Sequence, residues 1–508
     1  MGGLLIDLLG NLGFGALEEW SKSKRPASLP LYLYNTLGKS KQIFTLPAQA
    51  SAVRMYNCGP TVYDVQHIGN LSMFVFADTL RRALEYNNFS VKQVINITDV
   101  GHLTSDADEG EDKMTKGLRR EGKELTLENM RELGERYTKI FLNDLQKLNI
   151  DISNITFPRA SSYIPAQIAL ISTLVEKGYA YKTDDGVYFD TTRTKDYGVL
   201  GGINLGDGKN SRLGGKAAKR NLADFALWKF SSKSPNALGW DSPWGKGFPG
   251  WHTECSAMIR ATLGERIDIH TGGLEHVAVH HNNEIVQSEA VTGKRPLARF
   301  WMHRAHVQFE GAKLAKSEGR VVYLSDITQK GFHPLALRYH FLGAHYRTTS
   351  NFTWNALEAS QTAFLKLRQI VASTSETGAP PINYKNRIHE RLNDDLDTPG
   401  ALAALWEMTK DQNVTAADTR ATILDADRVL GLNLGKEDKD ADAAILRLFG
   451  KKVDLSDLPE DIAKSIKARA EARAAKNWDE ADSIRSELAA AGYVLEDTGS
   501  GTAVFKKE

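Results

Sequence analysis

The sequence predicts an α/β fold in its N-terminal part and an α-helical C-terminal part. Residues 52–100 show an apolar strand pattern, a glycine-containing turn, a helical pattern and a second strand pattern. This order forms a βαβ unit, which builds a parallel sheet with a ligand site at the carboxyl ends of its strands. Strand-like sequence returns at 265–273, and from about residue 355 the pattern is helical and rich in alanine. We therefore expect a sheet-based domain followed by a helical bundle.

The individual elements follow from local patterns. Residues 31–36 and 52–58 resemble strands, and the helical pattern at 73–87 has apolar residues at four-residue spacing. Residues 155–244 change character and predict an insertion into the first domain, with a Gly/Lys-rich surface loop at 201–220. Further elements are expected as a strand at 91–100, a helix at 125–148 and a small terminal piece at 493–506.

Composition and charge exclude several classes of protein. The chain has 508 residues, of which 42% are hydrophobic and 25% are charged, as in ordinary globular proteins. The net charge is +1, so a nucleic-acid partner would have to be bound by local basic patches. The two cysteines form no secreted disulfide framework and favour a cytoplasmic protein. The sequence contains no run of 18 apolar residues, so it predicts no membrane span. Residues 1–30 are expected to be an N-terminal extension.

Four residues could form a metal site. Cys58 follows a strand, and Cys255 lies in the segment PGWHTECSAM. His280 and Glu284 are four residues apart, so on a helix they share a face. Two thiolates, an imidazole and a carboxylate suit zinc. Spacing alone leaves a second interpretation open, in which the thiols are buried core residues and the histidine caps a helix.

Two segments could bind phosphate. His67, Gly69 and Asn70 stand at the start of a predicted helix, where free N–H groups and the helix dipole attract anions. Lys313 and Lys316 lie in the glycine-flanked segment KLAKS, where two ammonium groups could bracket a polyphosphate. Alone, each segment also fits an ordinary turn or a solvated lysine-rich face.

Together these motifs resemble the cysteinyl-tRNA synthetase family. The run YNCGPTVYDVQHIGN (56–70) resembles the family signature with its HIGH-type motif. It is followed in the family's order by FPGWHTECSAM, DIHTGG, HHNNEIVQSEA and KLAKS, and the tail KNWDEADSIRSELAAAGYVLEDT resembles the family's anticodon-binding segment. The resemblance covers nearly the whole chain from about residue 31.

The resemblance implies a class I synthetase that activates L-cysteine with ATP and Mg²⁺ and transfers it to tRNA(Cys). Its implied zinc ligands, one ion per chain, are Cys58, Cys255, His280 and Glu284. The implied amino-acid pocket includes Gly59, Trp251 and Glu275. The implied catalytic and ATP-binding residues are His67, Gly69, Asn70, Lys313, Lys316 and Ser317.

The expected oligomeric state is a monomer, and the resemblance also implies a domain organisation. The expected boundaries are an extension (1–30), a Rossmann-type catalytic domain in two halves (31–154 and 245–297), a connective insertion (155–244), a stem-contact region with the KMSKS-type loop (298–355), a helical bundle (356–450) and an anticodon-binding domain (451–508).

Three residues depart from the family pattern. Asn70 replaces the second histidine of HIGH, and Ala315 replaces the hydroxyl residue of KMSKS. Glu275 stands where the family usually has an aspartate near the substrate's amino group, so one extra methylene must be accommodated. These departures keep a catalytically silent tRNA-binding paralogue open as an alternative. A tRNA-independent ligase that joins cysteine to an amino sugar is a second alternative, against which the long helical tail argues.

Overall fold

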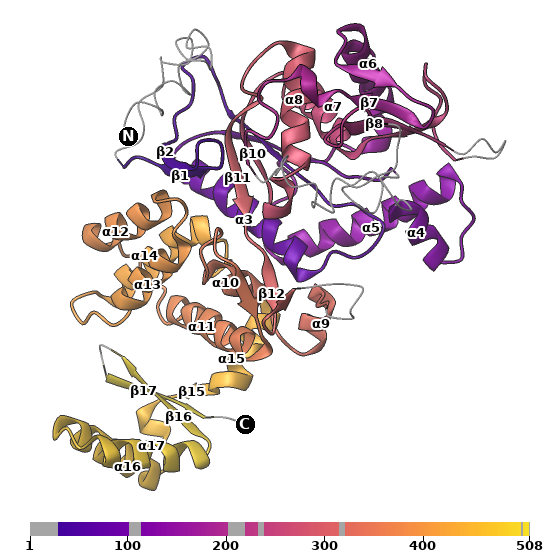
Figure 1. Cartoon of the computed structure of the whole chain (residues 1–508). Coiled ribbons are helices and arrows are strands. Elements are labelled where there is room, and N and C mark those ends of the chain that lie inside the picture. Colours follow the sequence, from indigo (N-terminus) through magenta and orange to yellow (C-terminus); the bar gives the residue numbers. More distant parts are fainter. Residues whose placement is uncertain are drawn as a thin grey trace. The chain divides into compact units, whose positions relative to one another are not determined.

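The computed structural model forms two compact units, which are described separately (Figure 1). The first unit consists of the chain up to Leu324 together with two later segments, His345–Phe352 and Asn393–Leu396. The second unit contains the remaining C-terminal residues. The structure describes residues 29–100, 113–201, 219–231, 238–313, 321–498 and 501–506.

The first unit is built on a five-stranded parallel sheet with the strand order β11-β10-β3-β4-β5. Along the chain, β3 is the first strand of this sheet; β4 and β5 are then added on one side of it, and β10 and β11 later on the other. The order therefore reverses between β3 and β10, which is where α/β sheets bind ligands. The predicted βαβ unit is confirmed. The strands are β3 (Val53–Asn57), β4 (Val91–Ile95), β5 (Ile155–Thr156), β10 (Ile267–Gly273) and β11 (Ala298–Arg304).

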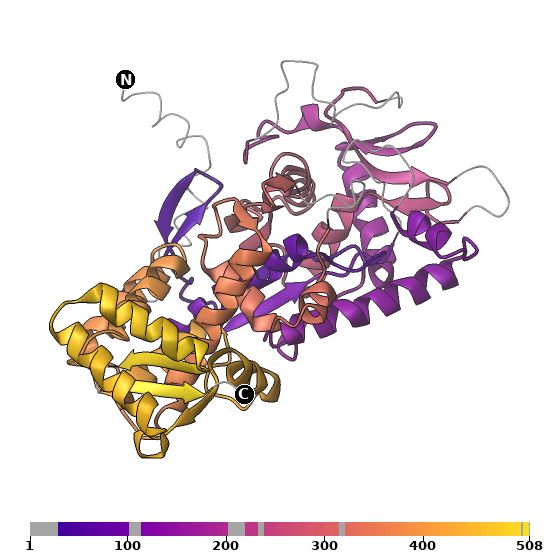
Figure 2. The ribbon, with the colours of Figure 1, turned by 90° about the horizontal axis from the view of Figure 1, so that it is seen from below.

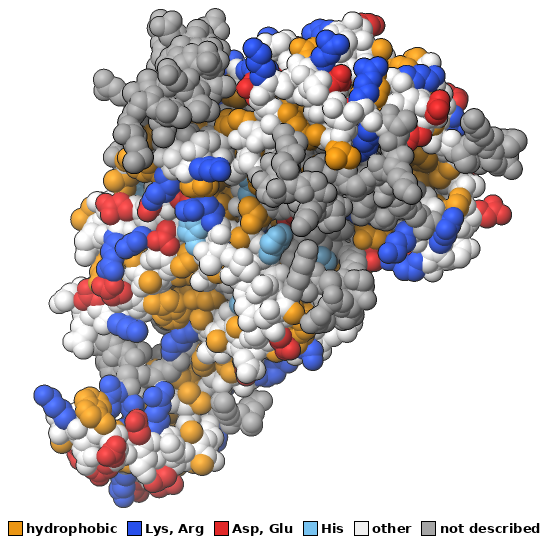
Figure 3. Space-filling model, viewed as in Figure 1, with side chains coloured by type: hydrophobic (Ala, Val, Ile, Leu, Met, Phe, Trp, Pro, Cys, Tyr) orange, Lys and Arg blue, Asp and Glu red, His pale blue; other side chains and the backbone are white. Residues whose placement is uncertain are grey.

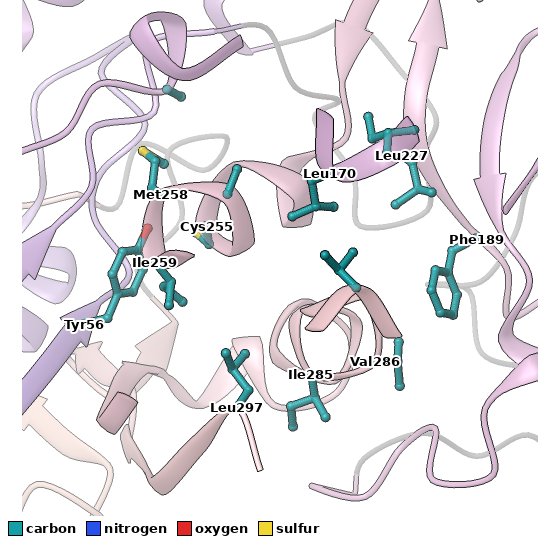
Figure 4. Close-up of a cluster of buried hydrophobic side chains, with 14 of the residues drawn as sticks. Tyr56, Leu170, Phe189, Leu227, Cys255, Met258, Ile259, Ile285, Val286 and Leu297 are labelled. Carbon is teal, nitrogen blue, oxygen red and sulfur yellow. The ribbon is translucent and has the colours of Figure 1, made fainter. Parts of the chain in front are cut away.

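Helices bury the apolar side chains of this sheet. Tyr56 and Val94 are paired neighbours on adjacent strands, and both belong to a core that also includes residues of α6, α7 and α8. Figure 4 shows Cys255 and Met258 of α7 near Tyr56, and Ile285 and Val286 of α8 in the same cluster. The helix α3 connects β3 to β4, and its apolar residues are almost all buried. The bounds are α3 (Ile68–Tyr86), α6 (Ile164–Glu176), α7 (Trp251–Thr262) and α8 (His280–Thr292).

Smaller sheets and two helices complete the first unit. The predicted insertion supplies most of a four-stranded antiparallel sheet with the order β6-β7-β8-β9. Two of its strands have buried aromatic residues, including Phe189 and Trp228. The remaining bounds are β1 (Tyr32–Asn35), β2 (Ser40–Ile43), α4 (Lys113–Arg120), α5 (Leu127–Lys147), β6 (Ala180–Lys182), β7 (Gly186–Phe189), β8 (Phe225–Phe230), β9 (Gly247–Pro249), β12 (Val307–Phe309), β13 (Ala312–Lys313) and β14 (Ser350–Phe352).

The second unit is mainly helical, as the alanine-rich pattern predicts. Several of its helices begin with a side-chain cap, such as Thr353 for α11 and Thr415 for α14, whose hydroxyl groups accept backbone N–H groups of the first turn. The helices are α9 (Leu324–Gln329), α10 (Pro334–Leu342), α11 (Trp354–Ala372), α12 (Ile382–Asn393), α13 (Thr398–Met408), α14 (Ala416–Leu430) and α15 (Lys439–Phe449).

A small module with its own core ends the chain. The helices α16 and α17 pack together beside a three-stranded antiparallel sheet, shown in yellow in Figure 2. Ile462, Leu488, Leu495 and Val504 form its buried core. The bounds are β15 (Lys451–Val453), α16 (Glu460–Ala474), α17 (Trp478–Ala490), β16 (Tyr493–Thr498) and β17 (Gly501–Lys506).

The described residues on the face drawn in Figure 3 show no dominant sign of charge. On the face drawn in Figure 3, basic and acidic side chains are interspersed, in agreement with the net charge of +1. Among the described residues, no helix combines the length and the apolar character that crossing a membrane requires.

Candidate metal centre

The fold brings the two cysteines together. Cys58 directly follows β3, and Cys255 lies on α7; both are buried, unbridged thiols whose side chains hydrogen-bond to each other. Burial raises the pKa of Cys58. Burial also acts to raise the pKa of Cys255, but its hydrogen bonds with Cys58 and His280 outweigh this effect and lower the pKa to about 6. The pair can therefore hold a thiolate in the interior.

The histidine and the glutamate of α8 meet beside these thiols. His280 Nε2 lies 2.8 Å from Glu284 Oε1, one helical turn away. The other ring nitrogen, His280 Nδ1, lies 3.0 Å from His252 Nδ1, so Nε2 is the atom turned toward Glu284. The second carboxylate oxygen, Glu284 Oε2, lies 2.8 Å from His270 Nε2. Both oxygens of this buried carboxylate are therefore fixed.

The charges of this pair are strongly coupled. Burial would lower the pKa of His280, but the negative charge of Glu284 raises it to about 10. Burial would raise the pKa of Glu284, but the nearby His270 and His280 lower it below its ordinary value. This coupling thus favours an imidazolium at His280 beside an ionised carboxylate at Glu284.

A second histidine, which sequence reasoning did not include, also belongs to this cluster. The ligand atoms of Cys58, His280, His281 and Glu284 all lie within 4.8 Å of one another. Cys255 is not one of these four, although it hydrogen-bonds to two of them. His281 Nε2 lies 3.2 Å from Cys58 Sγ. Its only signal in the sequence is its position next to His280.

The residues present fit a zinc ion. The donors are thiol, imidazole and carboxylate groups, which are the ligand types of zinc. His280 Nε2 is buried, and it lies 2.8 Å from Glu284 Oε1 without the geometry of a hydrogen bond to that oxygen. A buried nitrogen without such a bond costs free energy, so its position favours a bound cation as its partner.

The predicted pocket residues Trp251, Glu275 and Gly59 have different surroundings. The ring of Trp251 packs 4.1 Å from the ring of His280, centroid to centroid, so Trp251 forms an aromatic wall of the cluster. Glu275 is about half exposed, and its Oε2 lies 3.6 Å from His306 Nδ1. The backbone N–H of Gly59 donates to Asn96 Oδ1 at 2.7 Å.

Gly59 leaves no room for a side chain, which gives a first testable prediction. A Cβ at this position would lie 1.5 Å from the backbone oxygen of Asn96, which cannot move without displacing the end of β4. We expect Gly59→Ala to lower the free energy of unfolding by about 1–3 kcal/mol or more, as overpacking does. Denaturant unfolding measures this change. Gly343→Ala is the control, because its nearest neighbour would be 3.4 Å away; equal stability of the two variants would contradict the prediction.

The first phosphate motif lies at a helix N-terminus, as predicted. His67 is the N-cap of α3, and its Nδ1 accepts the backbone N–H of Asn70 at 3.2 Å. The sequence predicted that the segment containing His67 could bind phosphate; in the structure, one ring nitrogen of His67 caps the helix. Gly69 lies in the first turn of α3.

The chain following the second motif lies beside the first. The backbone N–H of Ile68 donates to the oxygen of Val322 at 2.9 Å, and His67 forms a β-bridge with Tyr323. Lys313 is part of β13, whereas Ala315, Lys316 and Ser317 lie outside the described residues. The fold thus places Val322 and Tyr323, which follow the KLAKS segment in the chain, beside the start of α3.

The fold and the matching catalytic-domain model assign this chain to the class I aminoacyl-tRNA synthetases. The fold resembles a methionyl-tRNA synthetase from Mycobacterium tuberculosis in complex with methionyl-adenylate (TM-score 0.52, 13% identity, 78% of this chain and 91% of that chain). It also resembles a LeuRS from Agrobacterium radiobacter K84, in a ternary complex with tRNA and LeuAMS (TM-score 0.53, 11% identity, 79% and 85%). The model of the class I (C) tRNA synthetase catalytic domain matches residues 44–362.

The chain belongs to the cysteine–tRNA ligase family. The family model of the cysteinyl-tRNA ligase anticodon binding domain matches residues 455–504. A relative named cysteine–tRNA ligase 1, from Burkholderia lata, is 45% identical over 94% of this chain and 97% of its own length. A cysteine–tRNA ligase from Treponema denticola is 38% identical over 94% of this chain and all of its own length. The resemblance seen in the sequence is confirmed.

Proposed function

We propose that this chain activates L-cysteine with ATP and transfers the cysteine to tRNA(Cys). Membership of the cysteine–tRNA ligase family carries this proposal. The meeting of two thiols, a histidine and a glutamate at the carboxyl end of β3 supports it, because this is the ligand position of a parallel sheet. The two alternatives, an amino-sugar ligase and a silent tRNA-binding protein, are not favoured.

We further propose that one zinc ion per chain is held by Cys58, Cys255, His280 and Glu284. Zinc would bind the substrate's thiolate and so distinguish cysteine from serine, whose hydroxyl ionises far less readily. The neighbouring side chains fix the ligands. His252 orients the ring of His280 through Nδ1, and this leaves Nε2 for the metal. His281 is assigned here as a hydrogen-bond donor to Cys58.

The ATP site is proposed at the start of α3. The backbone N–H of Gly69, together with the helix dipole, would bind phosphate there, with Mg²⁺ as the counter-ion. Asn70 lies on the same turn, and Lys313, Lys316 and Ser317 would approach from the adjoining segment. The β-bridge between His67 and Tyr323 supports this arrangement.

One experiment tests the proposed function. Purified protein is assayed for cysteine-dependent ATP–pyrophosphate exchange and for charging of tRNA(Cys). Both activities are expected. Exchange without charging would favour the amino-sugar ligase, and absence of both would favour the silent paralogue. We also propose that the protein acts as a monomer in the cytoplasm, which is consistent with its two unbridged cysteines.

The C-terminal module is proposed to bind the anticodon of the tRNA. The side chains of Lys464 and Lys467 on α16, and of Lys476 just after this helix, are exposed and could contact phosphates. Arg469, which the sequence placed in the same basic stretch, is buried and cannot contribute to this surface. The module has its own core, and the proposed cysteine and ATP residues all lie before residue 320.

A truncation separates the two reactions. Deletion after residue 450 is expected to leave pyrophosphate exchange near the wild-type rate and to reduce tRNA charging strongly, because the module has no role in adenylate formation. Both assays are run on the same preparation, with circular dichroism as the folding control. A milder variant, Lys464→Glu with Lys467→Glu, should weaken charging and increase its salt sensitivity. Normal charging by the truncated protein would rule out this assignment.

A further inference from the structure

His276 lies at the edge of the candidate metal centre without being one of its proposed ligands. It ends the short turn Leu274–His276 that follows β10. Its ring centroid lies 5.6 Å from that of Trp251, in an edge-on arrangement, and 5.2 Å from those of His280 and His281. The imidazole therefore borders the same space as the aromatic wall.

A glycine makes this position possible. A Cβ on Gly272 would lie 2.6 Å from His276 Nδ1. The ring thus lies directly against the backbone at the carboxyl end of β10, and Nδ1 is the atom held there. Any side chain at residue 272 would displace the imidazole.

The same nitrogen has no partner in the described part of the chain. His276 Nδ1 is buried and forms no hydrogen bond with a described residue. A buried polar atom lowers the stability of the fold unless it has a hydrogen-bond partner, and in a binding site that partner can be the ligand. His276 is not one of the four proposed zinc ligands, so the partner we expect for its unpaired Nδ1 is the substrate and not the metal.

The surrounding charges indicate which end of the substrate lies here. Free cysteine carries an ammonium and a carboxylate. Glu275, the preceding residue, supplies a negative charge, whereas the ammonium of Lys113 lies 5.5 Å from the ring centroid of Trp251. The ammonium of cysteine is therefore favoured on the side of Glu275. Because an ammonium has three N–H donors, a single carboxylate leaves donors for a second acceptor.

We propose that His276 is a substrate-binding residue whose Nδ1 accepts a hydrogen bond from the α-ammonium group of cysteine. The proposal rests on the proposed function, since it assumes that cysteine binds with its thiol at the metal centre. It adds an acceptor that the motifs did not indicate, next to Glu275. It also gives the unpaired nitrogen a chemical role.

Three thiol ligands test this contact. L-Cysteine has both charged groups, cysteamine keeps the ammonium, and 3-mercaptopropionate keeps the carboxylate. Their binding constants are measured by competition in pyrophosphate exchange and by calorimetry. The proteins compared are the zinc-loaded wild type, His276→Leu and His276→Asn. Asparagine is the rescue variant, because its amide oxygen can occupy the place of Nδ1.

The expected result is a loss of affinity for only those ligands that carry an ammonium group. In His276→Leu, cysteine and cysteamine should bind about ten- to a hundredfold more weakly, as befits a lost hydrogen bond to a charged group. The affinity for 3-mercaptopropionate, the zinc content and the KM for ATP should change by less than about twofold, which is well below the expected loss of affinity for cysteine and cysteamine. His276→Asn should recover most of the affinity for cysteine.

Other outcomes would overturn the assignment. Equal weakening of all three ligands would mean that His276 only shapes the pocket, and loss of zinc would mean that it supports the metal. Unchanged binding of all three would mean that it does not touch the substrate. Failure of the proposed function is distinguishable, because then the wild type itself would neither bind cysteine nor support exchange.

Discussion

Replacing Cys255 with serine should abolish stable zinc binding and slow cysteine activation by about a thousandfold or more. The thiolate is a strong zinc ligand, and a serine hydroxyl stays protonated near neutral pH. The metal's stabilisation of charge is worth several kcal/mol, and each 1.36 kcal/mol is about tenfold in rate. The wild type should contain about one zinc per chain, in keeping with the single proposed set of four ligands.

Elemental analysis after dialysis against a chelator measures the zinc, and pyrophosphate exchange measures activation. Cys58→Ser, His280→Ala and Glu284→Gln should behave like Cys255→Ser. Thermal unfolding of each variant is compared with that of the metal-free wild type, which separates loss of metal from loss of fold. A fully active wild-type preparation without zinc would refute the proposed site.

His281 provides the decisive comparison, because it lies within the cluster whereas Cys255 is outside the tightest group. If His281 only donates a hydrogen bond to Cys58, then His281→Gln should keep the zinc with an affinity lowered about 10–100-fold, as for the loss of an outer partner. Retention of zinc by Cys255→Ser together with its loss from His281→Ala would instead make His281 the fourth ligand.

Lys316→Ala should slow cysteine activation by about a hundred- to a thousandfold while leaving cysteine binding nearly unchanged. The lysine is expected to contact phosphate charge that develops in the transition state. If it acts like an oxyanion-hole donor, its loss costs about 2.7–4 kcal/mol. The rate of pyrophosphate exchange and the binding constant of cysteine are measured on the same preparation.

A surface lysine gives the matched control for this variant. Lys139 on α5 is exposed, so Lys139→Ala should leave both quantities unchanged. An exchange rate for Lys316→Ala equal to that of the control would show that the KLAKS segment is not catalytic. A proportional rise in KM without a change in kcat would indicate ground-state binding of ATP instead.

The sequence determined the local elements and part of the site. Because helical periodicity and turn residues act over a few positions, the βαβ unit, the position of His67 at a helix start and the helical second unit were all predicted. The same local rule placed His280 and Glu284 on one face of a helix, and their side chains are indeed in contact. The family resemblance, carried by ordered motifs, indicated the activity.

The tertiary structure alone decided how distant segments meet. Spacing could not bring Cys58 to Cys255, because this contact depends on the reversal of strand order between β3 and β10 and on the packing of α7. Burial likewise removed Arg469 from the basic surface. The histidines around the candidate metal centre, including His281 and His276, come from turns and helix starts whose directions depend on long-range packing. Contacts between remote residues depend on the whole fold, and no local pattern encodes them.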